Sequence, residues 1–165
     1  MQRRSNASVF MERGTKLRAV LQRVKRCSVA VEGEVYSEIG EGLLVLLGVE
    51  PDDGNDQTDY LADKILKVRI FPDGDGRMNL SALDVRAGIM VVSQFTLLAN
   101  CSKGRRPSFV AAAPPEKAEE LYRVFVGRVS DSGLTVRTGV FGAMMNVRLD
   151  NWGPVTFIVD TPPKE

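Results

Sequence analysis

IMVVSQFTLL, residues 89–98, is the stretch around which the rest of the chain can be organised. Its first four residues form a continuous apolar run, which is typical of a buried strand. Polar groups then follow in quick succession, with hydroxyls on Ser93 and Thr96 and an amide on Gln94. This change predicts that the strand leaves the core near Ser93 and opens toward solvent, although an ordinary strand end with satisfied hydroxyls has the same pattern.

A second unusual stretch, NWGPVT, occupies residues 151–156 near the C-terminus. Glycine before proline escapes the steric clash that restricts other residues at that position, and bonds to proline are the usual site of cis peptides. Read alone, Gly153-Pro154 predicts only a turn that leads into the last strand. A functional interpretation requires this stretch and residues 89–98 to meet.

The composition is that of one globular domain: 165 residues, 44% of them hydrophobic and 26% charged. The longest apolar run, residues 43–47, is too short to cross a bilayer, and no signal peptide is recognisable at the N-terminus. We therefore expect a cytoplasmic protein. Its net charge of +1 gives no global field that attracts nucleic acid, so any RNA contact must come from a local patch.

The chain contains no histidine, which excludes a Ser-His-Asp triad, a Cys-His pair and any zinc site that needs imidazole. Cys27 and Cys101 are too few for a disulfide framework and lack the spacing of metal ligands. We expect no metal and no cofactor. Proton transfers in any reaction must then use carboxylates, hydroxyls, backbone groups, water or the substrate itself.

Hydrophobic periodicity predicts a single α/β domain. We expect a flexible extension over residues 1–16, the domain over residues 17–160 and a tail over residues 161–165. Strands are predicted at 17–31, 35–39, 43–49, 69–71, 89–97, 134–138, 143–149 and 155–159. The first three of these strands should be antiparallel. Helices are predicted at 56–67 and from Pro114-Pro115 to Ser132-Gly133, both with acidic residues near the N-terminus.

A basic loop follows the central strand, with Lys103, Arg105 and Arg106 within four positions. Most charged runs of this kind are simply solvated. Its place directly after residues 89–98 favours contact with phosphate groups instead.

The two stretches together resemble the D-aminoacyl-tRNA deacylase family. The resemblance covers residues 17–160 and includes the opening AVLQRV, the VEG turn, GLLVLLGV, RIF, RPSF and the alternating Met145, Val147, Leu149 and Asn151. It implies one domain with mainly antiparallel sheets in a barrel-like core and two main helices. Trp152 departs from the family pattern, because a small acidic residue is common at that position.

The resemblance implies a homodimer that hydrolyses the ester between a D-amino acid and the 3′-terminal adenosine of tRNA, and that also acts on glycyl-tRNA mischarged on tRNA(Ala). Ser93, Gln94, Phe95 and Thr96 would line the adenosine and the ester. Gly153 and Pro154 would enter the partner subunit's pocket as a Gly-cis-Pro element. Further substrate contacts are expected from Asn151, Thr156, Met145, Lys103, Arg105 and Arg106.

Main-chain groups could provide both the selection and the oxyanion stabilisation at such a site. Carbonyl groups held rigidly near the substrate's α-carbon would admit a hydrogen and clash with an L side chain, which is selection by rejection. Backbone N–H groups at Phe95 and Thr96 could hold the developing oxyanion. No histidine is available to activate Thr96 as a nucleophile, so we expect attack by water with help from the tRNA 2′-hydroxyl.

Three alternatives remain open from the sequence. The chain could be an RNA-binding module that uses the basic loop but leaves the ester intact. It could be a dimeric scaffold whose apolar strands pair between chains, with no affinity for RNA. It could also be a related deacylase that tolerates L-amino acids, which would need a trans Gly153-Pro154 bond.

Overall fold

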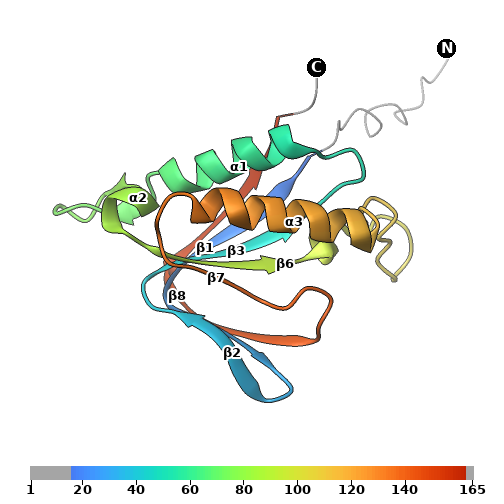
Figure 1. Ribbon diagram of the computed structural model, residues 1–165, viewed down its shortest axis with the longest axis horizontal. Coiled ribbons are helices and arrows are strands. Elements are labelled where there is room, and N and C mark those ends of the chain that lie inside the picture. Colours follow the sequence, from blue (N-terminus) through green and yellow to red (C-terminus); the bar gives the residue numbers. More distant parts are fainter. Residues whose placement is uncertain (1–15, 163–165) are drawn as a thin grey trace, which may run out of the picture.

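The computed structural model describes residues 16–162, which form a mixed sheet covered on one face by two helices (Figure 1). The elements in chain order are β1 (Arg18–Val31), β2 (Glu34–Ile39), β3 (Gly42–Gly48), α1 (Asn55–Lys67), β4 (Phe71–Pro72), β5 (Met78–Leu80), α2 (Ala82–Val85), β6 (Gly88–Ser93), the 3₁₀ helix η2 (Phe95–Leu98), α3 (Pro115–Ser130), β7 (Val136–Thr138) and β8 (Met145–Asp160). This confirms a single α/β domain with two main helices.

Strand β1 organises the sheet, because it pairs antiparallel with β2, β3 and β8. Its first half pairs with β3 and its second half with β2, while β8 runs along almost its whole length. The predicted antiparallel opening is therefore correct. Strands β6 and β7 extend the sheet beyond β3 with parallel pairing.

The sheet curls into a nearly closed, barrel-like shape. The Ser37 hydroxyl on β2 donates a hydrogen bond of 2.6 Å to the Thr138 carbonyl at the end of β7. The Val140 N–H lies 3.4 Å from the Met145 sulfur at the start of β8. The Ser37 contact brings β2 and β7, the opposite ends of the strand order, together.

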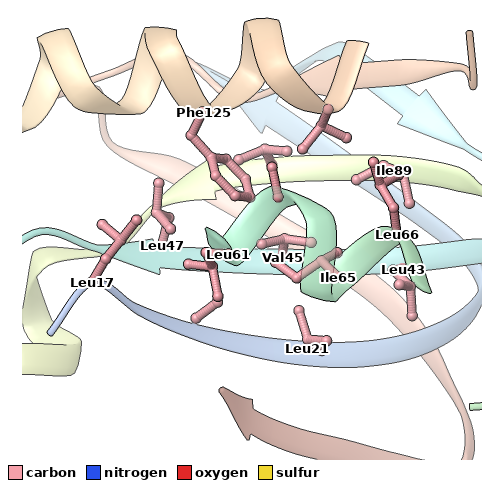
Figure 2. Packing of buried hydrophobic residues seen from close by; sticks show 14 of the residues in the cluster. Leu17, Leu21, Leu43, Val45, Leu47, Leu61, Ile65, Leu66, Ile89 and Phe125 are labelled. Atoms are coloured by element: carbon pink, nitrogen blue, oxygen red, sulfur yellow. The ribbon is translucent and has the colours of Figure 1, made fainter. Parts of the chain in front are cut away.

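The main core lies between the sheet and helices α1 and α3 (Figure 2). Both helices form where they were predicted, because apolar residues recur at helical spacing and Pro115 begins α3. Phe125 of α3 and Leu61 and Ile65 of α1 point at the sheet and are fully buried. A second apolar cluster on the sheet consists of Val24, Cys27, Val29, Ile39, Leu44, Met90 and Val92.

Three predicted boundaries were wrong. Strand β6 ends at Ser93 rather than at residue 97, and the chain turns into η2. The strands predicted at 143–149 and 155–159 form one strand, β8, interrupted by a bulge. Residues 69–71 contribute only Phe71 to a strand, the two-residue β4.

The ends of the described chain are tied together. Thr161 and Leu17 share two hydrogen bonds: the Thr161 N–H donates to the Leu17 carbonyl at 3.0 Å, and the Leu17 N–H donates to the Thr161 side-chain hydroxyl at 3.1 Å. Thr161 is buried, so it belongs to the packed domain rather than to the predicted tail. Lys16 and Pro162 of the predicted extension and tail are also described, whereas residues 1–15 and 163–165 lie outside the described residues. Among residues 16–162, no helix has the length and apolar character needed to span a bilayer.

Candidate functional site

The first candidate motif, Ser93 to Thr96, lies where β6 ends and η2 begins. Ser93 is in register with Leu47 of β3, and the Gln94 N–H donates to the Leu47 carbonyl at 2.8 Å. The chain then crosses close to Gly48, where an added Cβ would lie 3.3 Å from the Gln94 carbonyl oxygen and from the Leu97 Cβ. Backbone contacts therefore fix this turn and present its side chains toward solvent.

The side chains of the first motif are accessible. Phe95 is 54% exposed, Thr96 is exposed, and Ser93 and Gln94 are half-buried. The Gln94 amide nitrogen donates to the Thr96 hydroxyl. Phe95 and Thr96 are the first residues of η2, and the first N–H groups of a helix have no partner within the helix.

An aromatic pair and the basic loop border the first motif. Phe95 packs edge-on against Phe109, with ring centroids 5.0 Å apart. Asn100 and Ser108 exchange backbone hydrogen bonds of 2.7 and 2.8 Å, which close the loop between them. Lys103, Arg105 and Arg106 are all exposed on that loop. The structure thus places three cations within one short loop beside an exposed ring.

Met145 approaches the same end of β6 from β8. An added Cβ on Gly139 would lie 2.6 Å from the Met145 sulfur and 3.6 Å from the Val92 side chain. Gly139 therefore allows Met145 to pack near Val92, the residue before Ser93. Of the expected substrate contacts, Met145 and the basic loop lie on the side of the first motif.

The second candidate motif forms a bulge on β8. Asn151 pairs with Val24 and Thr156 pairs with Gln22, so residues 152–155 lie opposite Arg23 alone. Gly153 and Pro154 are exposed, and the bond between them is cis. This is the isomer that the resemblance implied.

Side chains hold this bulge in place. The guanidinium of Arg23 donates from Nε to the Trp152 carbonyl at 2.9 Å and from Nη1 to the Ile70 carbonyl at 2.8 Å. Burial lowers the pKa of Arg23, whose side chain is almost inaccessible. Asn151 accepts from the Val155 N–H at 2.7 Å and donates to the Thr156 hydroxyl at 3.1 Å. Asn151 and Thr156, expected to contact substrate, thus also bond within the bulge.

The two motifs lie on different parts of the sheet in one protomer. Ser93 is in line with Leu47 and with Ala19 on β1, whereas the bulge lies opposite Arg23, four positions further along β1. Strands β1 and β3 separate β8 from β6. With ~3.3 Å per residue and ~4.8 Å per strand, the path between the motifs along the surface of the sheet is roughly 20 Å long. Along the sheet, the two motifs are therefore separated by four positions of β1 and by two intervening strands.

The contacts of two arginines, the partly buried Arg18 and the buried Arg23, were not foreseen from the sequence. Arg18 binds the Asp160 carboxylate through Nε at 2.7 Å and Nη2 at 3.1 Å, and the hydrogen bond to Asp160 raises the pKa of Arg18. Its Nη1 also reaches the Leu97 carbonyl of η2 at 3.5 Å. Arg18 therefore links β1 and β8 to the turn after Ser93. Basic residues that alternate on a strand resemble a solvated face, so neither Arg18 nor Arg23 carried a recognisable signal.

Other groups in the described chain offer no obvious chemistry. No cluster of three or more Cys, Asp or Glu able to hold a metal occurs among residues 16–162. Burial raises the pKa of the Cys27 thiol to about 11, which keeps it protonated. A cavity of about 380 Å³ between α3 and β2 is lined by Tyr36, Tyr122 and Phe141 but by no residue of either motif.

Comparisons with known proteins identify the family of the chain. The family model described as D-Tyr-tRNA(Tyr) deacylase matches residues 20–160. A protein from Desulfatibacillum aliphaticivorans named D-aminoacyl-tRNA deacylase is 56% identical, with 88% of this chain and 99% of the relative covered. A protein of the same name from a Geobacter species is 55% identical, covering 90% of this chain and 99% of the relative.

Two solved structures share the fold. One, described as "c-Myc DNA Unwinding Element Binding Protein", has a TM-score of 0.83 and 40% identity over 88% of this chain and 99% of that chain. The other, described as a probable eukaryotic D-amino acid tRNA deacylase, has a TM-score of 0.79 and 19% identity over 88% and 100%, which shows the fold alone. The family match confirms the enzyme class expected from the two motifs: the chain belongs to the D-Tyr-tRNA(Tyr) deacylase family.

Proposed function

We propose that this protein hydrolyses the ester that joins a D-amino acid to the 3′-terminal adenosine of tRNA, and that glycyl-tRNA mischarged on tRNA(Ala) is a further substrate. One observation carries the proposal. The turn from Ser93 to Thr96 presents two hydroxyls, an amide and an exposed aromatic ring at a strand end that backbone contacts hold in place. Because its substrate is aminoacyl-tRNA, we place the protein in the cytoplasm.

The surroundings of this turn suit the end of an RNA strand. Stacking of a base on an aromatic side chain contributes ~1–3 kcal/mol and accepts any base. Phe95, supported edge-on by Phe109, is the ring available for the terminal adenine. Lys103, Arg105 and Arg106 would contact phosphates of the acceptor end, where each neutralised phosphate adds salt-dependent affinity.

The chemistry relies on geometry rather than on a strong base. Water attacks the ester carbonyl carbon, the bond from that carbon to the ribose 3′-oxygen breaks, and this oxygen leaves with a proton. The neighbouring 2′-hydroxyl of the tRNA assists the proton transfer, because the chain has no histidine. The N–H groups of Phe95 and Thr96 would stabilise the oxyanion, an effect worth ~3–4 kcal/mol per donor in other enzymes.

A homodimer would complete the site. The separation of the motifs within one protomer supports entry of Gly153 and Pro154 into the partner's pocket. Main-chain carbonyl groups of this bulge would lie against the substrate's α-carbon and reject an L side chain while admitting D-amino acids or glycine. Asn151 and Thr156 would then act through the shape of the bulge.

The second candidate function is nucleic-acid binding without hydrolysis. The exposed basic loop favours it, as does the likeness to a structure whose description names a DNA element. This function predicts that a DNA duplex competes with tRNA and that bound ester survives.

The deciding experiment measures deacylation of D-Tyr-tRNA and L-Tyr-tRNA side by side with the purified protein. We expect rapid loss of the D-ester and much slower, but measurable, loss of the L-ester at the same protein concentration. Equal loss of both esters would overturn the selection mechanism. Survival of both esters on bound tRNA would overturn the hydrolysis and establish the binding function instead.

A further inference from the structure

Trp152, the only tryptophan in the chain, lies under two cations of β1. The Lys25 ammonium is 3.6 Å from the centroid of the indole ring, and the Arg23 guanidinium carbon is 4.3 Å from a ring centroid of the same side chain. Both distances are well inside the ~6 Å limit for cation–π attraction, and tryptophan is the strongest partner for it. The ring immediately precedes Gly153 and Pro154.

Other contacts fix each member of this group. Arg23 is buried and bonded to the carbonyl groups of Ile70 and of Trp152 itself. The Lys25 ammonium lies 2.8 Å from the Glu41 carboxylate, which orients it from the solvent side. The half-buried ring also packs against the edge of the main core. We name Arg23, Lys25 and Glu41, which together hold the Trp152 ring, the indole clamp.

The clamp acts on the bulge through its first residue. The Trp152 carbonyl is held by Arg23 and its ring by both cations, so neither the main chain nor the side chain of Trp152 is free to rotate. An acidic residue at this position would attract the same two cations by charge. Trp152 attracts them through its ring and adds apolar packing, while adding no negative charge next to Gly153.

We propose that Trp152 is a positioning residue for the Gly153-Pro154 bulge, held by the indole clamp, and that it sets how strictly the enzyme rejects L-aminoacyl esters. This inference rests on the proposed function of the bulge. Trp152 itself need not touch the substrate. Loosening the clamp should let the bulge move and admit L side chains.

The existence of the clamp can be tested without any substrate, because all tryptophan fluorescence comes from Trp152. We expect Lys25→Met to increase quenching of this fluorescence by acrylamide in the free protein. Lys64→Met is the matched control, since it removes a cation 5.7 Å from the Tyr60 ring on α1 and should leave the quenching unchanged. Equal quenching in wild type and Lys25→Met would show that Lys25 does not clamp the ring.

The effect on selection is measured as the ratio of kcat/KM for D-Tyr-tRNA to that for L-Tyr-tRNA. We expect Lys25→Met to lower this ratio about two- to five-fold, as the strength of an exposed cation–π contact implies. Trp152→Ala should lower it further. Trp152→Phe, which keeps an aromatic ring under both cations, should restore most of the wild-type ratio.

A Trp152→Ala protein that is folded by circular dichroism and keeps the wild-type ratio would overturn the inference. If that variant does not fold, an unchanged ratio in Lys25→Met would overturn it equally. Failure of the proposed function gives a different result, because the wild type would then hydrolyse neither ester, while the quenching experiment would still show whether the clamp exists.

Discussion

The two motifs differ in what holds them. The turn from Ser93 to Thr96 is fixed by backbone hydrogen bonds, from Gln94 to Leu47 and from Leu97 and Ala99 back into the turn itself. The bulge at residues 152–155 is fixed by side chains, with Arg23 bonded to one end and Asn151 bonded to the other. Substitutions in the first motif should therefore change chemistry, whereas substitutions around the second should change geometry and stability.

Arg23→Met should produce the largest loss of stability. It removes two charge-assisted hydrogen bonds and leaves the carbonyl groups of Ile70 and Trp152 without their donor in a buried site. We expect the free energy of unfolding to fall by ~2–4 kcal/mol, measured by urea denaturation. Arg23→Lys, which restores the charge but not the two-pronged geometry, should recover only part of this loss. Wild-type stability in Arg23→Met would contradict the anchoring role.

Asn151→Ala should have the next largest effect. It leaves the N–H of the buried Val155 without an acceptor and should lower the free energy of unfolding by ~1–2 kcal/mol. Preference for D-Tyr-tRNA over L-Tyr-tRNA should fall with it. Asn151→Asp keeps the accepting oxygen and should keep both properties close to those of the wild type. If Ala and Asp behave alike, Asn151 does not support the bulge.

Thr96→Val tests the turn from Ser93 to Thr96, where a substitution should change activity rather than stability. Thr96 is exposed, and its side chain bonds only to the Gln94 side chain among the contacts seen, so the free energy of unfolding should change by less than ~0.5 kcal/mol. The kcat/KM for D-Tyr-tRNA should fall roughly tenfold, or ~1.4 kcal/mol of transition-state stabilisation. Loss of stability together with unchanged activity would reverse the roles assigned to the two motifs.

Replacing Lys103, Arg105 and Arg106 together by glutamine should have the smallest effect on the fold. All three residues are exposed, so the free energy of unfolding should stay within ~0.5 kcal/mol of the wild type. KM should rise, and the slope of log KM against log salt should drop by about 2 if all three contact phosphates of a single strand. Lys67→Gln on α1 is the control for a lost surface charge. An unchanged salt slope would remove the loop from the RNA interface.

Local signals account for what the sequence predicted. Helices α1 and α3 follow from apolar spacing and from acidic residues or proline at their N-termini, and β1 follows from alternation along a long strand. The two motifs were found because their residue types and order match a family pattern.

Long-range contacts account for what the sequence did not predict. Strand β6 ends early because its partner β3 ends at Gly48 and the chain crosses over that glycine. The burial of Arg23 could not be predicted locally, because its two carbonyl partners lie 47 and 129 residues away in the chain. Local hydrophobic periodicity predicts neither the early end of β6 nor the burial of Arg23. Trp152 likewise shows its role only when the two cations of β1 are seen over its ring.

In the proposed active site, Ser93–Thr96 of one protomer combines with Gly153-Pro154 of another. Two variants would each block the site from one side: Thr96→Arg fills the pocket, and Gly153→Leu adds a side chain to the inserted bulge. Each variant alone should be inactive.

The most direct measurement is D-Tyr-tRNA deacylation by these two variants after they are unfolded, mixed in equal amounts and refolded. In a mixed dimer, one site pairs the intact turn of one variant with the intact bulge of the other, so random pairing should restore about a quarter of the wild-type sites. The contradicting result is a mixture that stays as inactive as each variant alone while size-exclusion chromatography shows refolded dimers. Both motifs would then act within one protomer, and the active site would not be shared between two protomers.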